Sequence, residues 1–113
     1  MVCCSVFSIS AQPKFEFTNC NSYDDSILYL TKTCDKELNA ENSAQLIAAA
    51  KDCFKYLKQN DAKNKSLFYF FMGAGFSQSI DSAIFYYKKS HSFALQANNL
   101  KRILEAEGRL LDA

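Results

Sequence analysis

Residues that break helices are scarce in this chain. The sequence holds three glycines and one proline, and Pro13 precedes every segment with helical spacing. Such scarcity is typical of a chain in which helices dominate. No run approaches the roughly 18 apolar residues that a membrane-spanning helix requires. We therefore expect an all-α protein without a membrane span.

Net charge is equally low, at +1 for 113 residues. A balance this even gives no general attraction for nucleic acid, so we expect no nucleic-acid partner. Hydrophobic residues make up 49% of the chain and aromatic residues 14%, which excludes a wholly disordered protein. A chain of this length forms one small core. We expect a single domain over residues 12–113.

Groups that carry catalysis or hold metals are few. His91 is the only histidine, and no cysteine or carboxylate lies at ligand spacing from it, so we expect it at or near the surface. None of the five cysteines forms a CxxC or CxxH pair, which argues against zinc. The glycine-rich run 73–75 lacks the preceding strand and third glycine of a nucleotide-binding loop, and we interpret it as a close helix contact. We predict no enzymatic activity, no metal and no cofactor.

Residues 1–11 have features of an export signal. An apolar stretch of about ten residues leads to Ala11, which occupies the place before a cleavage site. No lysine or arginine precedes this stretch, so the alternative is a short buried strand or simply an irregular N-terminus. Export predicts a periplasmic or secreted protein, and a retained segment predicts a cytoplasmic one. In the following residues, 12–21, Phe15 and Phe17 alternate with polar residues, which indicates a short extended arm.

Apolar residues recur at helical spacing in four or five later segments. The first helix is expected over residues 22–38, with Asn21 or Ser22 as its N-cap. The second is capped by Asn42 or Ser43 and ends at 59–61.

The later segments continue this pattern. Ser66 is the expected cap of the third helix, which runs to about residue 77, and Ser79 or Asp81 starts the fourth. The pair 98–99 indicates a break followed by a fifth helix, and the alternative is a fourth helix that continues to Leu111. We predict that these helices pack as antiparallel αα-hairpins.

Export would leave three cysteines, of which Cys20 and Cys53 are the best placed to pair. In a hairpin folded at residues 39–42, Cys34 lies near the turn and Cys53 near the open end, beside the start of the first helix. Under export we predict a Cys20–Cys53 disulfide, contributing about 3 to 4 kcal/mol in the loop-entropy model. The alternative is three unpaired thiols.

Aromatic residues gather in two short runs, 68–71 and 85–87. Most of them are expected in the core. Four consecutive aromatic residues go fully round a helix, so one core face cannot bury them all. We expect some to be exposed or covered by another chain, and a homodimer through exposed aromatics is compatible with this.

Large and small residues alternate along 67–90 in the manner of a known repeat. The residues that carry the pattern are Tyr69, Met72, Gly73, Phe76, Ala83, Tyr87 and Ser90. This window resembles a tetratricopeptide (TPR) or Sel1-like repeat, in which an aromatic, Leu-Gly and Tyr on one helix precede Ala, an aromatic and Ala on the next. The resemblance implies a concave groove that binds another protein. Carried onto this chain, its groove residues are Phe70, Ala74, Ser77, Gln78, Glu105 and Arg109.

A second candidate surface is basic, because Lys51, Lys55 and Lys58 lie along one side of the expected second helix. Together these features predict a non-catalytic, exported module that binds another protein. The alternative is a periplasmic immunity or inhibitor protein that blocks a secreted toxin or hydrolase. Co-purification with a hydrolase, and loss of its activity on mixing, distinguishes the inhibitor from the module.

Overall fold

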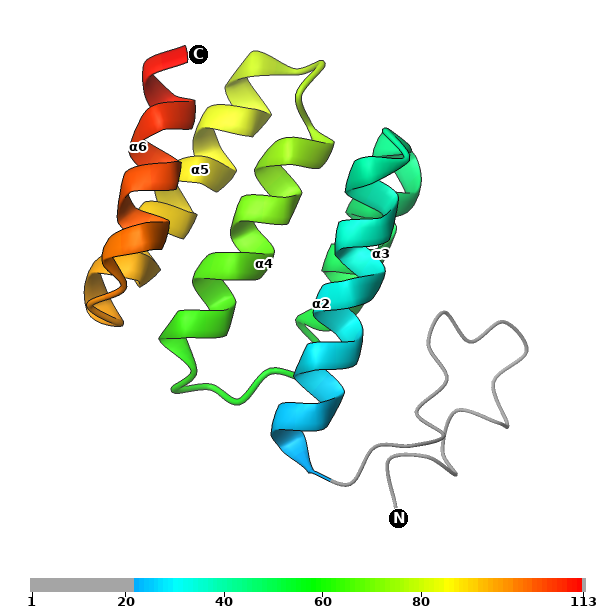
Figure 1. The fold of residues 1–113 in the computed structure, drawn as a ribbon. Coiled ribbons are helices and arrows are strands. Elements are labelled where there is room, and N and C mark those ends of the chain that lie inside the picture. The colour runs from blue at the N-terminus through cyan, green and yellow to red at the C-terminus, as the bar shows by residue number, and fades with distance from the viewer. Residues whose placement is uncertain (1–21, 113) are drawn as a thin grey trace.

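Five helices make up the part of the chain that the computed structural model describes, residues 22–112 (Figure 1). They are α2 (Tyr23–Asn39), α3 (Ser43–Cys53), α4 (Ala62–Gly75), α5 (Ile80–Gln96) and α6 (Leu100–Asp112). Residues 22–112 contain no strand, so the all-α expectation is confirmed for them. None of these five helices is both long and apolar enough to cross a lipid bilayer. The expected export signal at 1–11 and extended arm at 12–21 lie outside the described residues.

Polar side chains begin three of the helices where the sequence predicts. Ser22 and Asn42 each accept a hydrogen bond from the backbone N–H three residues later, at 3.1 and 3.4 Å. Asn99 does the same at 3.2 Å, directly after Asn98, whose φ is 55°. These oxygens satisfy N–H groups that have no partner inside the helix. The predicted break at 98–99 is confirmed.

α3 is shorter than predicted, ending at Cys53 rather than at 59–61. The N–H groups of residues 54–56 bond to carbonyls three residues back, which tightens the end of the helix. The Lys58 N–H then donates to the hydroxyl of Tyr23 at 3.0 Å. Because Tyr23 is distant in sequence, no local pattern reveals this ending.

α4 begins more than one turn before its predicted start. Its N-cap is Asp61, whose carboxylate accepts hydrogen bonds from the Asn64 backbone N–H at 3.1 Å and from the Asn64 amide at 2.8 Å. The polar residues 63–65 therefore form the first turn of the helix instead of a loop. Ser66, the predicted cap, is fully buried inside α4.

α4 lies at the centre of the described helices and contacts each of the other four. Its aromatic run 68–71 is therefore covered: Tyr69 is half-buried, and the three phenylalanines are at most 7% exposed. The expected exposure of aromatic residues is met instead by Phe85, which is 53% exposed. The sequence argument assumed one core face, whereas α4 has neighbours around its circumference.

Two glycines bring α4 close to its neighbours. A Cβ on Gly73 would lie 2.7 Å from ring carbons of Tyr87 in α5. A Cβ on Gly75 would lie 2.6 Å from the Ile47 side chain in α3. Both distances are shorter than carbon atoms tolerate, so the interpretation of run 73–75 as a close helix contact is confirmed.

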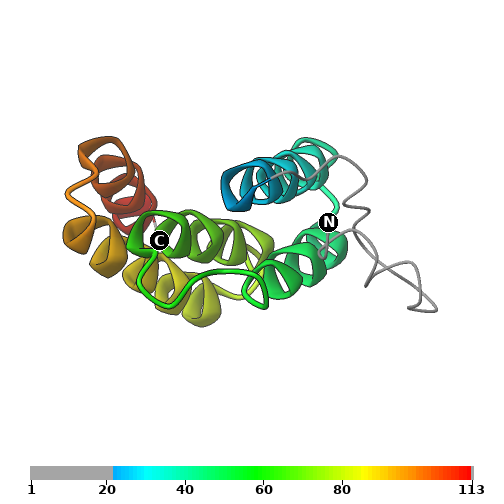
Figure 2. The ribbon, with the colours of Figure 1, turned by 90° about the horizontal axis from the view of Figure 1, so that it is seen from below.

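Figure 2 shows how this packing leaves one side of α4 uncovered by backbone. α2 and α6 both lie on the same side of α4, above it in this view, whereas α5 lies below it. The candidate site lies between α2 and α6.

Candidate functional site

A groove runs between α2 and α6, with α4 contributing its floor, and we call it the α2–α6 groove. Its volume is about 620 Å³. The lining residues are Thr31, Asp35 and Leu38 from α2, Leu67, Phe70 and Phe71 from α4, and Lys101, Arg102, Leu104, Glu105, Gly108, Arg109 and Asp112 from α6. The floor is apolar, and most of the charge comes from α6.

Phe70 lies in this floor, next to two arginines. The guanidinium carbons of Arg102 and Arg109 lie 5.3 and 5.4 Å from its ring centroid. The same ring packs against Tyr87, with centroids 5.4 Å apart. Cations are attracted to the face of an aromatic ring by its quadrupole. Arg109 also acts on Tyr87: burial raises the pKa of the Tyr87 hydroxyl, and the positive charge of Arg109 acts to lower it.

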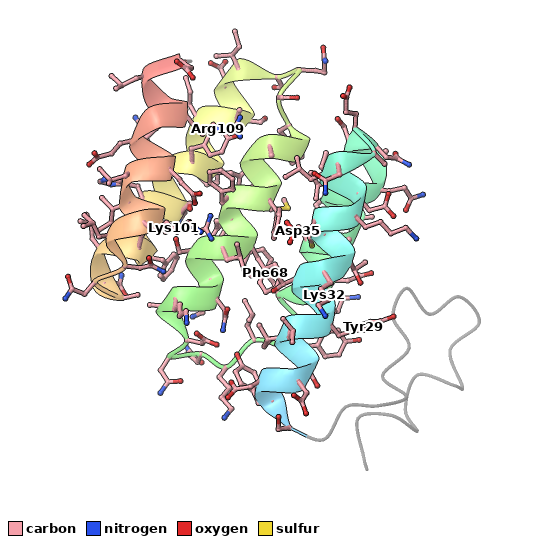
Figure 3. All side chains as sticks on the ribbon, in the orientation of Figure 1. Tyr29, Lys32, Asp35, Phe68, Lys101 and Arg109 are labelled. Atoms are coloured by element: carbon pink, nitrogen blue, oxygen red, sulfur yellow. The ribbon has the colours of Figure 1, made fainter. Side chains whose placement is uncertain are left out.

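The charged residues of the groove differ in their partners. Arg102 forms an ion pair with Glu105 on the same helix. Within residues 22–112, no ion pair joins an opposite charge to Arg109, to Lys101 or to Asp35. Figure 3 shows Asp35 on α2 and Lys101 on α6, at opposite sides of α4. Charges of both signs are therefore available to a bound molecule.

Of the six groove residues expected from the repeat resemblance, three lie in each of two adjoining hollows. The α2–α6 groove is lined by Phe70, Glu105 and Arg109, and a smaller hollow of about 210 Å³ between α2, α3 and α4 by Ala74, Ser77 and Gln78. Leu38 lines both hollows. Binding of a partner by these residues stays a prediction.

Sequence reasoning missed the α2 wall and two cations of α6. Lys101 and Arg102 could have been found, because they lie one turn before the expected groove residue Glu105 on the same helix. Asp35 could not, since its position opposite α6 depends on how α2 packs across α4.

The three lysines of the expected basic stripe are exposed, but they do not lie along one helix. Lys51 is in the last turn of α3. Lys55 follows the end of α3 and forms an ion pair with Asp52 at 3.3 Å. The Lys58 Nζ lies 4.4 Å from the ring centroid of Tyr23. The predicted helical stripe is wrong, because α3 ends before residues 55 and 58.

His91 has a carboxylate partner that its sequence neighbours do not reveal. Its Nε2 lies 2.9 Å from Glu107 Oε2, joining α5 to α6. The histidine side chain is 26% exposed, which agrees with the expected position near the surface. Among the described residues, no group of three or more histidine, cysteine or acidic side chains is arranged to hold a metal ion.

Cys34 and Cys53 are fully buried and both are free thiols. Their Sγ atoms lie 3.8 Å apart. The expected position of Cys53, beside the start of the first helix, is wrong. α3 has 11 residues against 17 in α2, so its last residue reaches only the middle of α2. Cys20 lies outside the described residues, and its disulfide with Cys53 stays a prediction.

Comparison of the chain with protein-family models, with curated proteins and with solved structures finds no match in any of the three. The function is therefore argued from the chemistry of the site.

Proposed function

We propose that this protein is a non-catalytic module of antiparallel, TPR-like helical hairpins that binds another protein through the α2–α6 groove. The turns support the hairpins: the connections 40–42, 76–79 and 97–99 have three or four residues. Connections this short are typical of helices that pack as antiparallel neighbours.

The groove floor is the observation that carries the binding proposal. In this floor Leu67 is half-buried, and beside it the α6 wall carries Arg109, a cation that lies against Phe70 and has no ion-pair partner among residues 22–112. Protein interfaces are enriched in arginine and aromatic residues, and such pairs form many of their energetically dominant contacts. A solvent-facing helix surface needs no such arrangement.

Exposed leucines on α6 extend the apolar surface beyond the floor. Leu100, Leu104 and Leu111 are 67%, 58% and 86% exposed. Their spacing of four and seven residues places them on one side of the helix. Leu104 also lines the α2–α6 groove, so this apolar side is continuous with the site. The exposed Glu107 separates Leu111 from the other two, so the apolar surface next to the groove consists of Leu100 and Leu104.

The groove chemistry defines the partner segment. An apolar side chain matches the half-buried Leu67 and the exposed Leu104 in the groove lining. A neighbouring carboxylate matches the guanidinium of Arg109, which can donate two parallel hydrogen bonds. The partner is therefore a peptide segment of mixed apolar and acidic character. Export, and the narrower role of a toxin inhibitor, stay predictions for this chain.

Gly108 offers a direct test, because it lines the groove and a Cβ there has no atom within 4 Å. Peptides are selected from a random displayed library against the full chain, and their affinities are then measured for variants. Gly108→Phe puts a ring into the groove at a position where the added Cβ meets no other atom. Arg109→Glu reverses the available charge. Ser92→Phe adds the same ring to an exposed position of α5 outside both hollows and is the matched control.

We expect the selected peptides to be apolar and acidic, and to lose about tenfold or more in affinity with both groove variants. The Ser92→Phe control should bind like the wild type. Equal binding by all three variants, with unchanged circular dichroism, would place the peptide site elsewhere and contradict the proposal.

A further inference from the structure

Two buried thiols meet where α2 and α3 pack together. Cys34 is in the middle of α2 and Cys53 is the last residue of α3, and both are 0% exposed. Their Sγ atoms are in contact at 3.8 Å, across 19 positions of sequence. Each thiol is the other's hydrogen-bonding partner in this contact.

The surroundings of the pair are apolar. The same core cluster holds Leu30, Leu46, Ala50 and Phe68, which are at most 2% exposed. Hydrogen bonding with Cys34, and then burial, raise the pKa of Cys53 far above its ordinary value. A protonated, shielded thiol is a poor nucleophile. Because both sulfurs are fully buried, the folded protein shields them from reagents in solvent.

We propose that Cys34 and Cys53 form a disulfide that joins α2 to α3. A disulfide bond is about 2.05 Å long, so the sulfurs must approach by roughly a further 1.8 Å. Among residues 22–112, Cys34 is the cysteine that lies against Cys53, and the proposed pairing uses it in place of Cys20.

The oxidant is a low-molecular-weight disulfide, such as oxidised glutathione. While the chain is still open, the thiolate of one cysteine attacks this disulfide, and a mixed disulfide forms as one glutathione thiolate leaves. The second cysteine then attacks the mixed disulfide and displaces the other glutathione. Two S–H bonds and one S–S bond are broken, one protein S–S bond forms, and two glutathione thiols carry away the protons and electrons.

Burial determines when this bond can form and when it can be reduced. Thiol–disulfide exchange takes seconds to hours, so the bond forms in chains that are unfolded or transiently open. Once the core has closed over Cys34 and Cys53, the bond resists reduction because reductants cannot reach the sulfurs. The bond also fixes α2, one wall of the α2–α6 groove, against α3. This effect of the bond on α2 does not depend on what the groove binds.

Tryptic mapping can identify the bond directly. The full chain is refolded in a mixture of reduced and oxidised glutathione, free thiols are alkylated, and the protein is digested. Lysines isolate Cys34 in the peptide 33–36 and Cys53 in the peptide 52–55, whereas Cys20 falls in the separate peptide 15–32. We expect 33–36 and 52–55 to be recovered as one linked species that reduction separates.

A link between 15–32 and 52–55, or free thiols at both Cys34 and Cys53 in the refolded protein, would overturn the proposal. A thermal measurement supplies a second readout. The midpoint of the oxidised wild type should fall by several degrees when the unfolded chain is reduced before the scan. The double variant Cys34→Ala, Cys53→Ala should show no such difference, and a wild type that also shows none would count against the bond.

Discussion

Asp61 has two roles at the residue scale. Its carboxylate caps α4 and also accepts a hydrogen bond from the Tyr23 hydroxyl at 2.5 Å, which ties the first turn of α2 to the start of α4. Burial, and then this bond to Asp61, raise the pKa of Tyr23 to about 12, so the hydroxyl remains a donor at neutral pH. Burial acts to raise the pKa of Asp61, but the hydrogen bonds from Asn64 and Tyr23 outweigh it and hold this pKa below 3.8.

Asp61 therefore stabilises the fold at neutral pH and loses this effect in acid. A folded-state pKa below the unfolded value gives a contribution that is complete above 3.8 and disappears as the pH falls below it. Asparagine and aspartate cap helices about equally well, so an asparagine in place of Asp61 would still supply the capping oxygen. We expect Asp61→Asn to lower the free energy of unfolding near neutral pH, and the difference from the wild type to shrink in acid.

Urea denaturation at a series of pH values measures this difference. Tyr23→Phe removes one of the hydrogen bonds to the carboxylate and should reduce the acid dependence without abolishing it. A difference between wild type and Asp61→Asn that stays constant below pH 3.8 would contradict the assignment.

Gly73 and Gly108 form a matched pair of helical glycines. Alanine at Gly73 places its Cβ 2.7 Å from the Tyr87 ring, so α4 and α5 must move apart. We expect Gly73→Ala to destabilise the fold by about 1 to 3 kcal/mol, as is usual for overpacking. Gly108→Ala meets no atom within 4 Å and should stabilise it by up to about 1 kcal/mol, through helix propensity. Chemical denaturation compares the two, and equal effects would argue against the close contact.

At the scale of the helices, two buried serines hydrogen-bond α4 to α5. Ser66 Oγ donates to the Ser90 carbonyl at 2.8 Å, and Ser90 Oγ donates to the Ser66 carbonyl at 2.7 Å. Both serines are fully buried. Beside them, the rings of Tyr69 and Phe93 stack almost in parallel, with centroids 5.6 Å apart. Two small polar residues thus let the helices approach, and the aromatic pair fills the space beside them.

Replacing either serine by alanine removes one interhelical hydrogen bond. We expect Ser66→Ala and Ser90→Ala each to lower the free energy of unfolding by about 1 kcal/mol. Ser92→Ala, at an exposed position of α5, is the control and should change it by less than about 0.5 kcal/mol. If Ser66→Ala and Ser90→Ala lower the free energy of unfolding no more than Ser92→Ala does, the two hydrogen bonds contribute nothing net.

Local chemistry explains which element boundaries were predictable. Ser22, Asn42 and the pair 98–99 were identified because an oxygen at the N-cap bonds to its own helix. The end of α3 was missed because the Lys58 N–H bonds to Tyr23, far away in sequence. The start of α4 was missed because a polar first turn with two lysines has the composition of a loop.

At the scale of the whole molecule, α4 and α6 differ most in how extensively they are buried against the other described helices. α4 contributes seven buried residues and contacts every other described helix, whereas α6 contributes one, Ala106. Half of the groove wall thus belongs to a weakly buried helix. The groove itself was only partly predictable, because α4 and α6 carry recognisable residues but the opposing α2 wall arises from tertiary packing.

Hydrogen exchange should reveal this difference. Amides of α6 are expected to exchange through local opening, at a lower free energy than the amides of α4, which require global unfolding. Mass-spectrometric exchange on the full chain measures both helices in one experiment. A selected peptide ligand should slow exchange in α6 more than in α5. Equal protection of α4 and α6 in the free protein would contradict this order.

The central position of α4 also bears on how the chain reaches its native state. Its largest contact is with α5, the helix that follows it, and the connection between them is only residues 76–79. Closing so short a loop costs little entropy, and proteins rich in local contacts fold in microseconds to milliseconds. We therefore expect the α4–α5 pair to form early in folding, and α3, α2 and α6 to pack onto it.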